Sequence, residues 1–171
     1  MEDKYEIFSE STINSFKSAD WGKCNINGNV FLSYNFLDLL EYSKSINVSS
    51  GWEPVYFGLK KNNQLVAVVP SFIKNHSQGE FVFDHSWAQA YQRLGMSYYP
   101  KLLIASPFSP VTGKRILTKL NNNLLVKEKL IKYIKEFCLK RNISSIHINF
   151  FDSSELSFFK KENFPLAHLV L

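Results

Sequence analysis

The sequence lacks the features that mark disulfide-bonded or membrane-spanning proteins. It has two cysteines, Cys24 and Cys138, which lie far apart and belong to no C-x-x-C pair. Such a pattern excludes a disulfide framework and predicts two buried thiols in a reducing compartment. The longest apolar run, Leu65–Ile73, is interrupted by Pro70 and Ser71. A membrane-spanning helix needs about 20 apolar residues, so no transmembrane segment is expected.

Other absences narrow the function classes. The first residues, Met1–Tyr5, lack the basic and apolar regions of a signal peptide, so we expect a cytoplasmic protein, at most peripheral to a membrane. His147 and His168 are isolated, and there is no His-x-x-His pair or Asp/His cluster, so no metal site is expected. A Gly-x-Ser-x-Gly elbow is also missing, which argues against a serine hydrolase.

What is present suits one folded domain. The chain has 171 residues, of which 45% are hydrophobic, and it includes 15 Phe and 8 Tyr that can fill a large core. Its net charge of +5 is compatible with an anionic partner such as a nucleotide cofactor, tRNA, a lipid-linked phosphate or a membrane surface. The lysines are scattered, so an ordinary solvated surface is the alternative. No recognition helix or RNP pattern is present, and DNA binding is not expected.

Hydrophobic periodicity predicts an α/β fold. Strands are predicted at Tyr5–Phe8, Pro54–Leu59, Leu65–Lys74, Glu80–Asp84, Lys101–Ser106, Ser144–Phe151 and Pro165–Leu171. Helices are predicted at Ser11–Trp21, Tyr34–Ser45, His85–Leu94, Leu124–Arg141 and Ser153–Glu162. One face of Leu124–Arg141 is predicted to be buried, formed by Leu124, Leu125, Leu130, Ile131, Ile134, Phe137 and Cys138. An antiparallel meander followed by alternating strands and helices implies a mixed sheet with helices on both faces.

This order of elements resembles the GNAT acetyltransferase fold, and four strings make the resemblance more specific. They are NVFLS at Asn29–Ser33, GEFVFD at Gly79–Asp84, YYPKL at Tyr98–Leu102 and PFSPVTGKR at Pro107–Arg115. Together they look like the FemAB-like peptidoglycan biosynthesis/recognition proteins, a bacterial branch of the GNAT superfamily. The resemblance implies a transferase that moves an acyl or aminoacyl group onto an amine of a peptidoglycan or cell-envelope precursor. The implied donor is acyl-CoA or aminoacyl-tRNA.

Proteins of this family are usually about twice as long, with a second GNAT-like domain. The resemblance therefore implies that residues 1–171 form a single GNAT-like domain, the N-terminal half of a two-domain protein. A second domain or a partner chain would complete the active site. The alternative is a non-catalytic module that binds an envelope precursor or a partner chain without chemistry.

Three residues are candidates for acid–base chemistry. Asp84 and His85 stand where a predicted strand ends and a helix begins, and Glu80 lies on the same strand face as Asp84. A carboxylate there can act as the base for an incoming amine, with His85 as a base or its partner. The structural alternative is that Asp84 caps the helix with its side chain.

The loop after Lys101–Ser106 is a candidate for binding the donor. Thr112, Gly113, Lys114 and Arg115 offer a free backbone, a hydroxyl and two cations, which suits a phosphate. Against this, two nearby prolines remove N–H groups, and the glycine-rich signature of coenzyme A binders is missing, which weakens CoA as the donor. The alternative is an ordinary proline-fixed turn.

An aromatic group surrounds the predicted third helix. Trp87, Tyr91, Tyr98 and Tyr99 are candidates to line a pocket for a sugar or peptide stem. Core packing is the alternative. Because ligand sites in α/β sheets gather at the carboxyl ends of strands, we expect Asp84 and the 112–115 loop to face one cleft.

Overall fold

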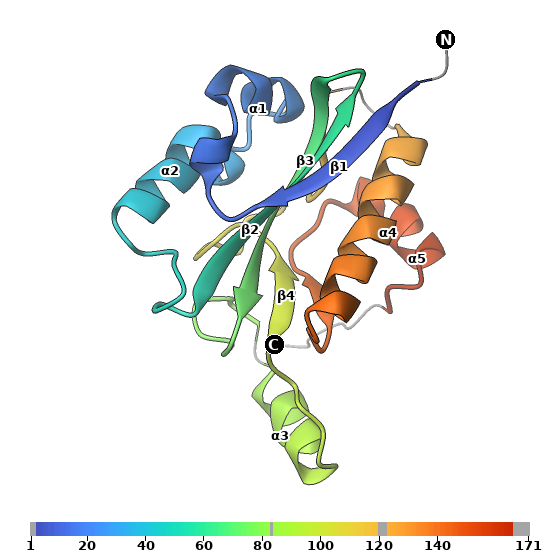
Figure 1. Cartoon of the computed structure of the whole chain (residues 1–171). Coiled ribbons are helices and arrows are strands. Elements are labelled where there is room, and N and C mark those ends of the chain that lie inside the picture. The colour runs from blue at the N-terminus through green and yellow to red at the C-terminus, as the bar shows by residue number, and fades with distance from the viewer. Residues whose placement is uncertain (1–2, 83, 120–122, 166–171) are drawn as a thin grey trace.

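The structure, a computed structural model, describes residues 3–82, 84–119 and 123–165, which form a sheet flanked by helices (Figure 1). The strands are β1 (Tyr5–Glu10), β2 (Trp52–Lys61), β3 (Gln64–Lys74), β4 (Lys101–Ile104), β5 (Leu117–Thr118) and β6 (Ile146–Ile148). The α-helices are α1 (Ser18–Cys24), α2 (Tyr34–Tyr42), α3 (His85–Arg93), α4 (Leu124–Lys140) and α5 (Leu156–Lys161). Short 3₁₀ turns are η1 (Ile13–Ser15), η2 (Val30–Leu32) and η3 (Ser153–Glu155).

The sheet is mixed, as predicted. Its order is β1-β2-β3-β4-β6, and β5 pairs with β3 outside this path. The neighbours from β1 to β4 are antiparallel, and β4 and β6 run parallel. The β2–β3 hairpin turns at Asn62 and Asn63, whose φ angles of 49° and 63° belong to the left-handed region that Asn tolerates in tight hairpins.

The edge of β3 is shared by two strands that are distant in sequence. Near its end β3 pairs with β4, where Phe72 lies opposite Leu103. Further back it pairs with β5, where Val68 lies opposite Leu117. The chain leaves the sheet after β4, and it rejoins the sheet where Gly113 forms a parallel bridge with Phe151. A loop is thus placed at the point where β4 and β6 end.

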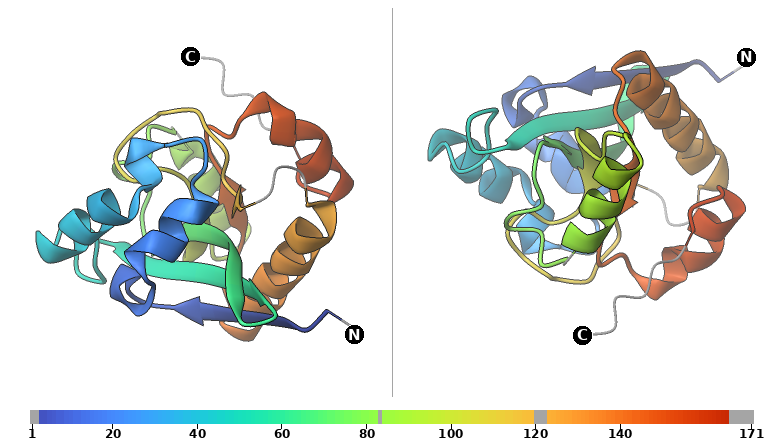
Figure 2. Two further views of the ribbon diagram at one scale, coloured as in Figure 1. Left: turned by 90° about the horizontal axis from the view of Figure 1, so that it is seen from above. Right: turned by 90° about the horizontal axis from the view of Figure 1, so that it is seen from below.

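Helices cover both faces of the sheet, which confirms the predicted layers. Alternate residues of β2 point to opposite sides: Phe57 and Leu59 enter a core with α4 and α5, whereas Tyr56 enters a core with α1 and α2. Figure 2 shows the two helix pairs separated by the sheet. Both faces therefore bury apolar surface, which is the main stabilising contribution to this fold.

Helix α4 follows its predicted stripe only in part. Leu130 and Ile134 are fully buried as expected, and Val126 continues the same face one turn earlier. The first-turn residues Leu124 and Leu125 are instead exposed, because the buried face repeats every four residues from Val126. Phe137, predicted to be buried, is only half-buried and stacks edge-on against the β2 ring of Phe57 at 5.1 Å.

Three predicted elements differ from the structure. The helix predicted over Ser153–Glu162 is divided into η3 and α5. The strand predicted over Glu80–Asp84 is wrong: Gly79 and Phe81 have φ angles of +78° and +57° and turn the chain out of the sheet. The helix predicted over Ser11–Trp21 is divided into η1 and α1. The predicted strand Pro165–Leu171 lies, beyond Pro165, outside the described residues.

The two cysteines are buried and free, as the sequence predicts. Burial raises the pKa of Cys24 to about 12 and that of Cys138 to about 12. Both therefore remain protonated thiols near neutral pH. Among the helices that the structure describes, none combines the length and the apolar character needed to cross a bilayer.

Candidate functional site

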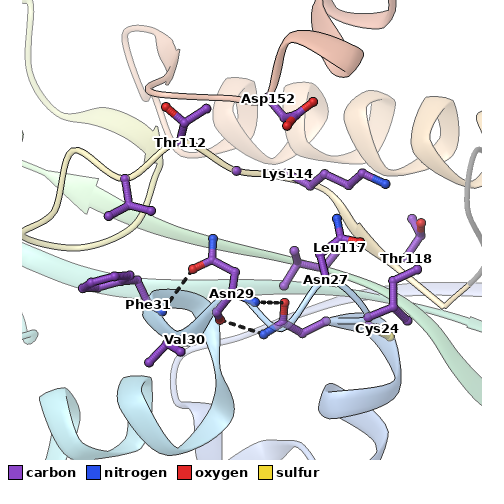
Figure 3. Close-up of a pocket in the computed structure, with 14 residues that line it drawn as sticks. Cys24, Asn27, Asn29, Val30, Phe31, Thr112, Lys114, Leu117, Thr118 and Asp152 are labelled. Atoms are coloured by element: carbon purple, nitrogen blue, oxygen red, sulfur yellow. Dashed lines mark hydrogen bonds between the residues drawn. The ribbon is translucent and has the colours of Figure 1, made fainter.

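A cavity of about 370 Å³ lies at the sheet edge where β4 and β6 end (Figure 3). Three segments line it: the loop between α1 and η2, the segment from Val111 to Thr118, and Asp152 after β6. Its polar side chains are the amides of Asn25, Asn27 and Asn29, the hydroxyls of Thr112 and Thr118, the ammonium of Lys114 and the carboxylate of Asp152. The site therefore combines neutral donors and acceptors with one group of each charge.

Asparagine side chains shape the first wall of this cavity. The Asn25 amide accepts from the Asn29 N–H at 3.2 Å and donates to the Asn29 carbonyl at 2.8 Å, which closes the loop. The Asn29 side-chain oxygen accepts from the Phe31 N–H at 3.1 Å and caps η2. The remaining Asn29 amide nitrogen faces Gly113, where an added Cβ would lie only 2.7 Å away. A side chain at position 113 would therefore displace the Asn29 amide and alter the contact between the two walls.

The second wall is joined to the sheet by its backbone. The Gly113 N–H donates to the Phe150 carbonyl at 3.1 Å, and the Arg115 N–H donates to Glu155 Oε2 at 2.7 Å. These two N–H groups are therefore not available to a phosphate, and the predicted free-backbone cradle is wrong at both positions. The reason is that the segment pairs with the chain beyond β6 instead of forming an open loop.

Arg115 points away from the cavity and is fully buried. Its Nε donates to the Asn149 carbonyl at 2.8 Å, and its Nη2 donates to the carbonyls of Phe150, also at 2.8 Å, and Val111. Burial lowers its pKa to about 10, so it stays cationic at neutral pH. Of the four loop residues singled out in the sequence, Thr112, Gly113 and Lys114 line the cavity, while Arg115 holds the wall together.

The charges in the cavity suit a polar ligand of mixed character. Asp152 accepts from the Ser154 N–H at 2.8 Å and caps η3. Hydrogen bonds from Ser154, with a smaller contribution from Lys114, hold the pKa of Asp152 below its usual range. Asp152 is thus a carboxylate at neutral pH and can bind an ammonium, while Lys114 can bind an anion. Cys24 also lines the cavity, but its raised pKa makes its thiol a poor nucleophile.

The predicted acids gather elsewhere, around a lysine that the sequence analysis missed. The ammonium of Lys101 is fully buried and lies 2.9 Å from Glu80 Oε2 and 2.6 Å from Asp84 Oδ2. It also donates to the Ser77 hydroxyl at 2.7 Å, and the Tyr98 hydroxyl donates to Asp84 at 2.7 Å. We call Lys101, Glu80, Asp84, Ser77 and Tyr98 the Lys101 cluster. Its signal in the sequence is a lysine that opens the apolar strand KLLI, because a buried cation needs anionic partners.

Burial acts differently on the ionisable groups of this region. Burial alone would raise the pKa of Asp84, but hydrogen bonds from Lys101, Ser77 and Tyr98 together hold it below its usual range. Burial raises the pKa of Glu80, and Lys101 offsets this only in part. Neighbouring Lys74 is buried against the Trp52 ring, and burial lowers its pKa to about 8. Glu80 is thus the carboxyl that takes up a proton more easily.

Asp84 therefore acts as an ion-pair partner, and its side chain does not cap α3. His85 begins α3 and is exposed, and Trp87, two residues later, is also exposed. Tyr91 and Tyr98 stack edge-on at 5.2 Å, and Tyr99 hydrogen-bonds Ser77 at 2.8 Å. None of these predicted aromatic residues lines the cavity described above.

The expected convergence of the two regions is wrong. Lys101 is the first residue of β4, whereas Gly113 bridges Phe151 beyond the last paired residues of β4 and β6. The Lys101 cluster and the cavity thus lie at opposite ends of this strand pair. The reason is that Asp84 follows a turn and not a strand, so it does not lie at the carboxyl end of a strand as predicted. Its ion pair with Lys101 places it beside the first residue of β4.

His147 in β6 provides a pH-dependent test of this packing. Its ring lies edge-on to Tyr98 at 5.7 Å, and burial, reinforced by the charge of Lys101, lowers its pKa to about 4. The folded state binds this proton less tightly than the unfolded chain does. The contribution of His147 to the free energy of unfolding is therefore fully present above pH 6.5 and is lost as the pH falls toward 4. We expect this group to contribute on the order of 2 kcal/mol.

Urea unfolding across this pH range measures the effect. His147→Gln should reduce the loss of stability that the wild-type protein shows as the pH falls from 6.5 toward 4. An identical pH slope for wild type and His147→Gln would show that His147 protonates freely in the folded state.

Comparison with known proteins agrees with this architecture. The chain is similar in structure to an aminoglycoside N-acetyltransferase in complex with CoA, with a TM-score of 0.57, 8% identity and coverage of 100% of this chain and 94% of the other. It is similar to a GCN5-related N-acetyltransferase from Ralstonia eutropha, with a TM-score of 0.58, 6% identity and coverage of 98% and 97%. A glucosamine-6-phosphate N-acetyltransferase from Arabidopsis thaliana gives a TM-score of 0.51 at 10% identity, covering 98% and 96%.

At such low sequence identity, the structural similarity establishes the fold alone, and it is the GNAT fold that the sequence predicts. No curated protein sequence matches the chain. A match to a protein family described as peptidoglycan biosynthesis/recognition extends over residues 12–168. Because it spans nearly the whole chain, this protein belongs to the FemAB-like family.

Proposed function

We propose that this chain is an acyltransferase domain that uses the cavity to bring an amine of a peptidoglycan or cell-envelope precursor to an activated acyl group in the cytoplasm. Family membership and the GNAT fold support the reaction class. The observation that carries the proposal is the cavity itself, which Lys114 and Asp152 line together at the ends of two parallel strands. Such strand ends are where α/β sheets gather ligands.

The residues that line the cavity would each have a role in binding the acceptor amine. Asp152 would bind the amine as an ammonium and orient it, since a carboxylate with a lowered pKa suits binding better than proton abstraction at neutral pH. The amides of Asn27 and Asn29 would recognise the hydroxyl or peptide groups of a sugar or peptide stem. In the transfer, the bound ammonium first loses a proton to water. The amine nitrogen then attacks the acyl carbon, the bond from that carbon to the leaving group breaks, and the excess proton of the nitrogen passes through water to the departing group.

Acyl-CoA is the donor that we propose, and aminoacyl-tRNA is the alternative. Both carry an acyl group activated for attack, and both present phosphates. Lys114 and Thr112 supply one cation and one hydroxyl for an anionic group. The Gly113 and Arg115 N–H groups are occupied, so these side chains would replace a backbone phosphate cradle.

The acid–base groups of the cavity favour a second function, which is recognition of a precursor without chemistry. Cys24 has a raised pKa and Asp152 a lowered one, so neither is poised near neutral pH. A module that recognises a precursor without chemistry needs no such group. A second domain, of which these 171 residues would be the N-terminal partner, would then supply the catalytic residues.

Binding and turnover together test the proposal. The chain is titrated by calorimetry with a peptidoglycan precursor that carries a free amine, and separately with acetyl-CoA. Asp152→Asn, which keeps the oxygen that caps η3, should weaken acceptor binding roughly tenfold, because a charge-assisted hydrogen bond is lost. Lys114→Met should weaken acetyl-CoA binding by a similar factor.

The matched controls are Glu136→Gln and Lys132→Met, which change exposed charges on α4 and should leave both affinities unchanged. Binding with transfer of the acetyl group establishes the transferase. Precursor binding without transfer, in the chain alone and with its second domain added, assigns the recognition module. Equal affinities for wild type, Asp152→Asn and Lys114→Met remove the cavity from the site.

A further inference from the structure

Helix α3 stands away from the body of the protein (Figures 1 and 2). None of its nine residues is buried. A helix of this length is unstable on its own in water. Its described anchors lie at its two ends: Asp84, before the first residue, pairs with Lys101, and Tyr91, in the last turn, packs against Tyr98. A helix held in this way gains stability when something else covers its exposed residues.

Part of the exposed surface of α3 is apolar. Trp87 and Leu94 are seven residues apart, which places them on one helix face, and they are 55% and 74% exposed. Phe81 before the helix and Met96 after it are each more than half exposed as well. Single exposed apolar residues are ordinary, but four large ones on one protruding element mark a binding surface.

The exposed charge on α3 itself has one sign. Glu80 and Asp84, the acids closest to α3 in sequence, are buried and paired with Lys101. Residues 85–127 contain no Asp or Glu at all. Arg93 in the last turn of α3 is exposed. The helix therefore presents cationic and apolar groups without a compensating anion.

The end of α4 extends this basic character. Lys140 and Arg141 are exposed, and Figure 1 shows this end of α4 at the same end of the molecule as α3. The two regions are linked directly, because the Ser144 N–H donates to the Pro100 carbonyl at 2.8 Å. The nearest exposed acid on α4, Glu136, lies one turn earlier.

We propose that this face, formed by Phe81, Trp87, Arg93, Leu94, Met96, Lys140 and Arg141, binds the surface of an anionic lipid bilayer. Tryptophan and other large apolar side chains enter the interfacial layer of a bilayer, and flanking cations bind acidic headgroups. A protein groove is the less suitable partner, because the apolar residues extend over a turn, a helix and a loop instead of one continuous helical stripe. This inference goes beyond acyl transfer and does not depend on it.

The tryptophans make the test direct. Trp21 and Trp52 are 0% and 2% exposed, so Trp87 is the tryptophan whose surroundings would change on membrane binding. The full chain is mixed with vesicles of phosphatidylcholine and phosphatidylglycerol, and with vesicles of phosphatidylcholine alone. We expect a blue shift of the fluorescence and cosedimentation with the anionic vesicles, both weakened by added salt.

Variants locate the contact. Trp87→Ser/Leu94→Ser should reduce partitioning roughly tenfold or more, and Arg93→Glu should reduce it specifically for anionic vesicles. The matched control is Leu39→Ser/Tyr42→Ser, which removes two exposed apolar residues from α2 and should bind as wild type does. Thermal unfolding should be nearly unchanged in all of these variants, because none of the replaced side chains is buried.

Three results would overturn the proposal. They are the absence of cosedimentation with anionic vesicles, equal loss of binding in the α2 control, and equal binding of wild type to the two kinds of vesicle. Concentration-dependent dimerisation abolished by Trp87→Ser/Leu94→Ser, without vesicle binding, would assign the face to a second copy of the chain instead. Since the readout is lipid binding alone, a chain without transferase activity still gives a decisive answer.

Discussion

Replacing Lys101 by methionine is expected to destabilise the fold by about 3–5 kcal/mol. Methionine fills nearly the same volume but leaves Glu80 and Asp84 buried without their cation. One oxygen of each carboxylate already has no hydrogen-bond partner among the described groups, so neither can compensate. Urea unfolding at neutral pH measures the loss, and Lys132→Met on the exposed face of α4 is the matched control.

Two further measurements show whether Lys101→Met loses stability through the missing ion pairs or through poorer packing. Unpaired buried carboxyls become protonated, so the penalty in Lys101→Met should shrink as the pH is lowered. Adding Glu80→Gln and Asp84→Asn to Lys101→Met should restore much of the stability, because three neutral groups replace an incomplete ion cluster. A loss that is independent of pH and remains in the triple variant would show that Lys101 contributes through shape alone.

Most of the fold could be predicted from local patterns. The strands β2 and β3 are apolar runs separated by a short polar turn, which predicts their hairpin, and α4 carries a four-residue repeat of buried side chains. The stretch Glu80–Asp84 also has an apolar centre between polar ends, yet it is not a strand. There the attraction between Lys101 and its two acids overrides local preference, and that attraction depends on residues about 20 positions apart in sequence.

The candidate site was predicted less completely. Thr112 and Lys114 were identified because a distinctive string contains them, and both line the cavity. Asn29 and Asp152, which line the same cavity, were missed, because they come from loops far away in sequence that only the fold brings together. A weak signal exists in the repeat Asn25-x-Asn27-x-Asn29 around Gly28, since side-chain amides shape such turns.

Glu155 is the other position where a single replacement should have a large effect, about 3–5 kcal/mol for Glu155→Ala. Its carboxylate is buried, and it accepts from the Arg115 N–H at 2.7 Å and from the Ile116 N–H at 3.4 Å. It also pairs with the buried ammonium of Lys127 at 3.2 Å. Alanine would leave one cation and two backbone donors buried without partners, each of which is costly.

Glu155→Ala should also loosen one wall of the cavity. Arg115 and Ile116 continue the wall formed by Thr112, Gly113 and Lys114, so release of their N–H groups should loosen that wall. Hydrogen exchange at the amides of Arg115 and Ile116 should accelerate in Glu155→Ala. Glu155→Gln should be affected less, because the amide oxygen still accepts one of these hydrogen bonds.

Glu136→Ala, an exposed acid on α4, is the control and should change the free energy of unfolding by less than about 0.5 kcal/mol. If Glu155→Ala unfolds at the wild-type urea concentration and its amides exchange no faster, Glu155 does not hold this wall. In that case the carbonyl contacts of the Arg115 side chain with Asn149 and Phe150 must suffice to place the segment beside β6.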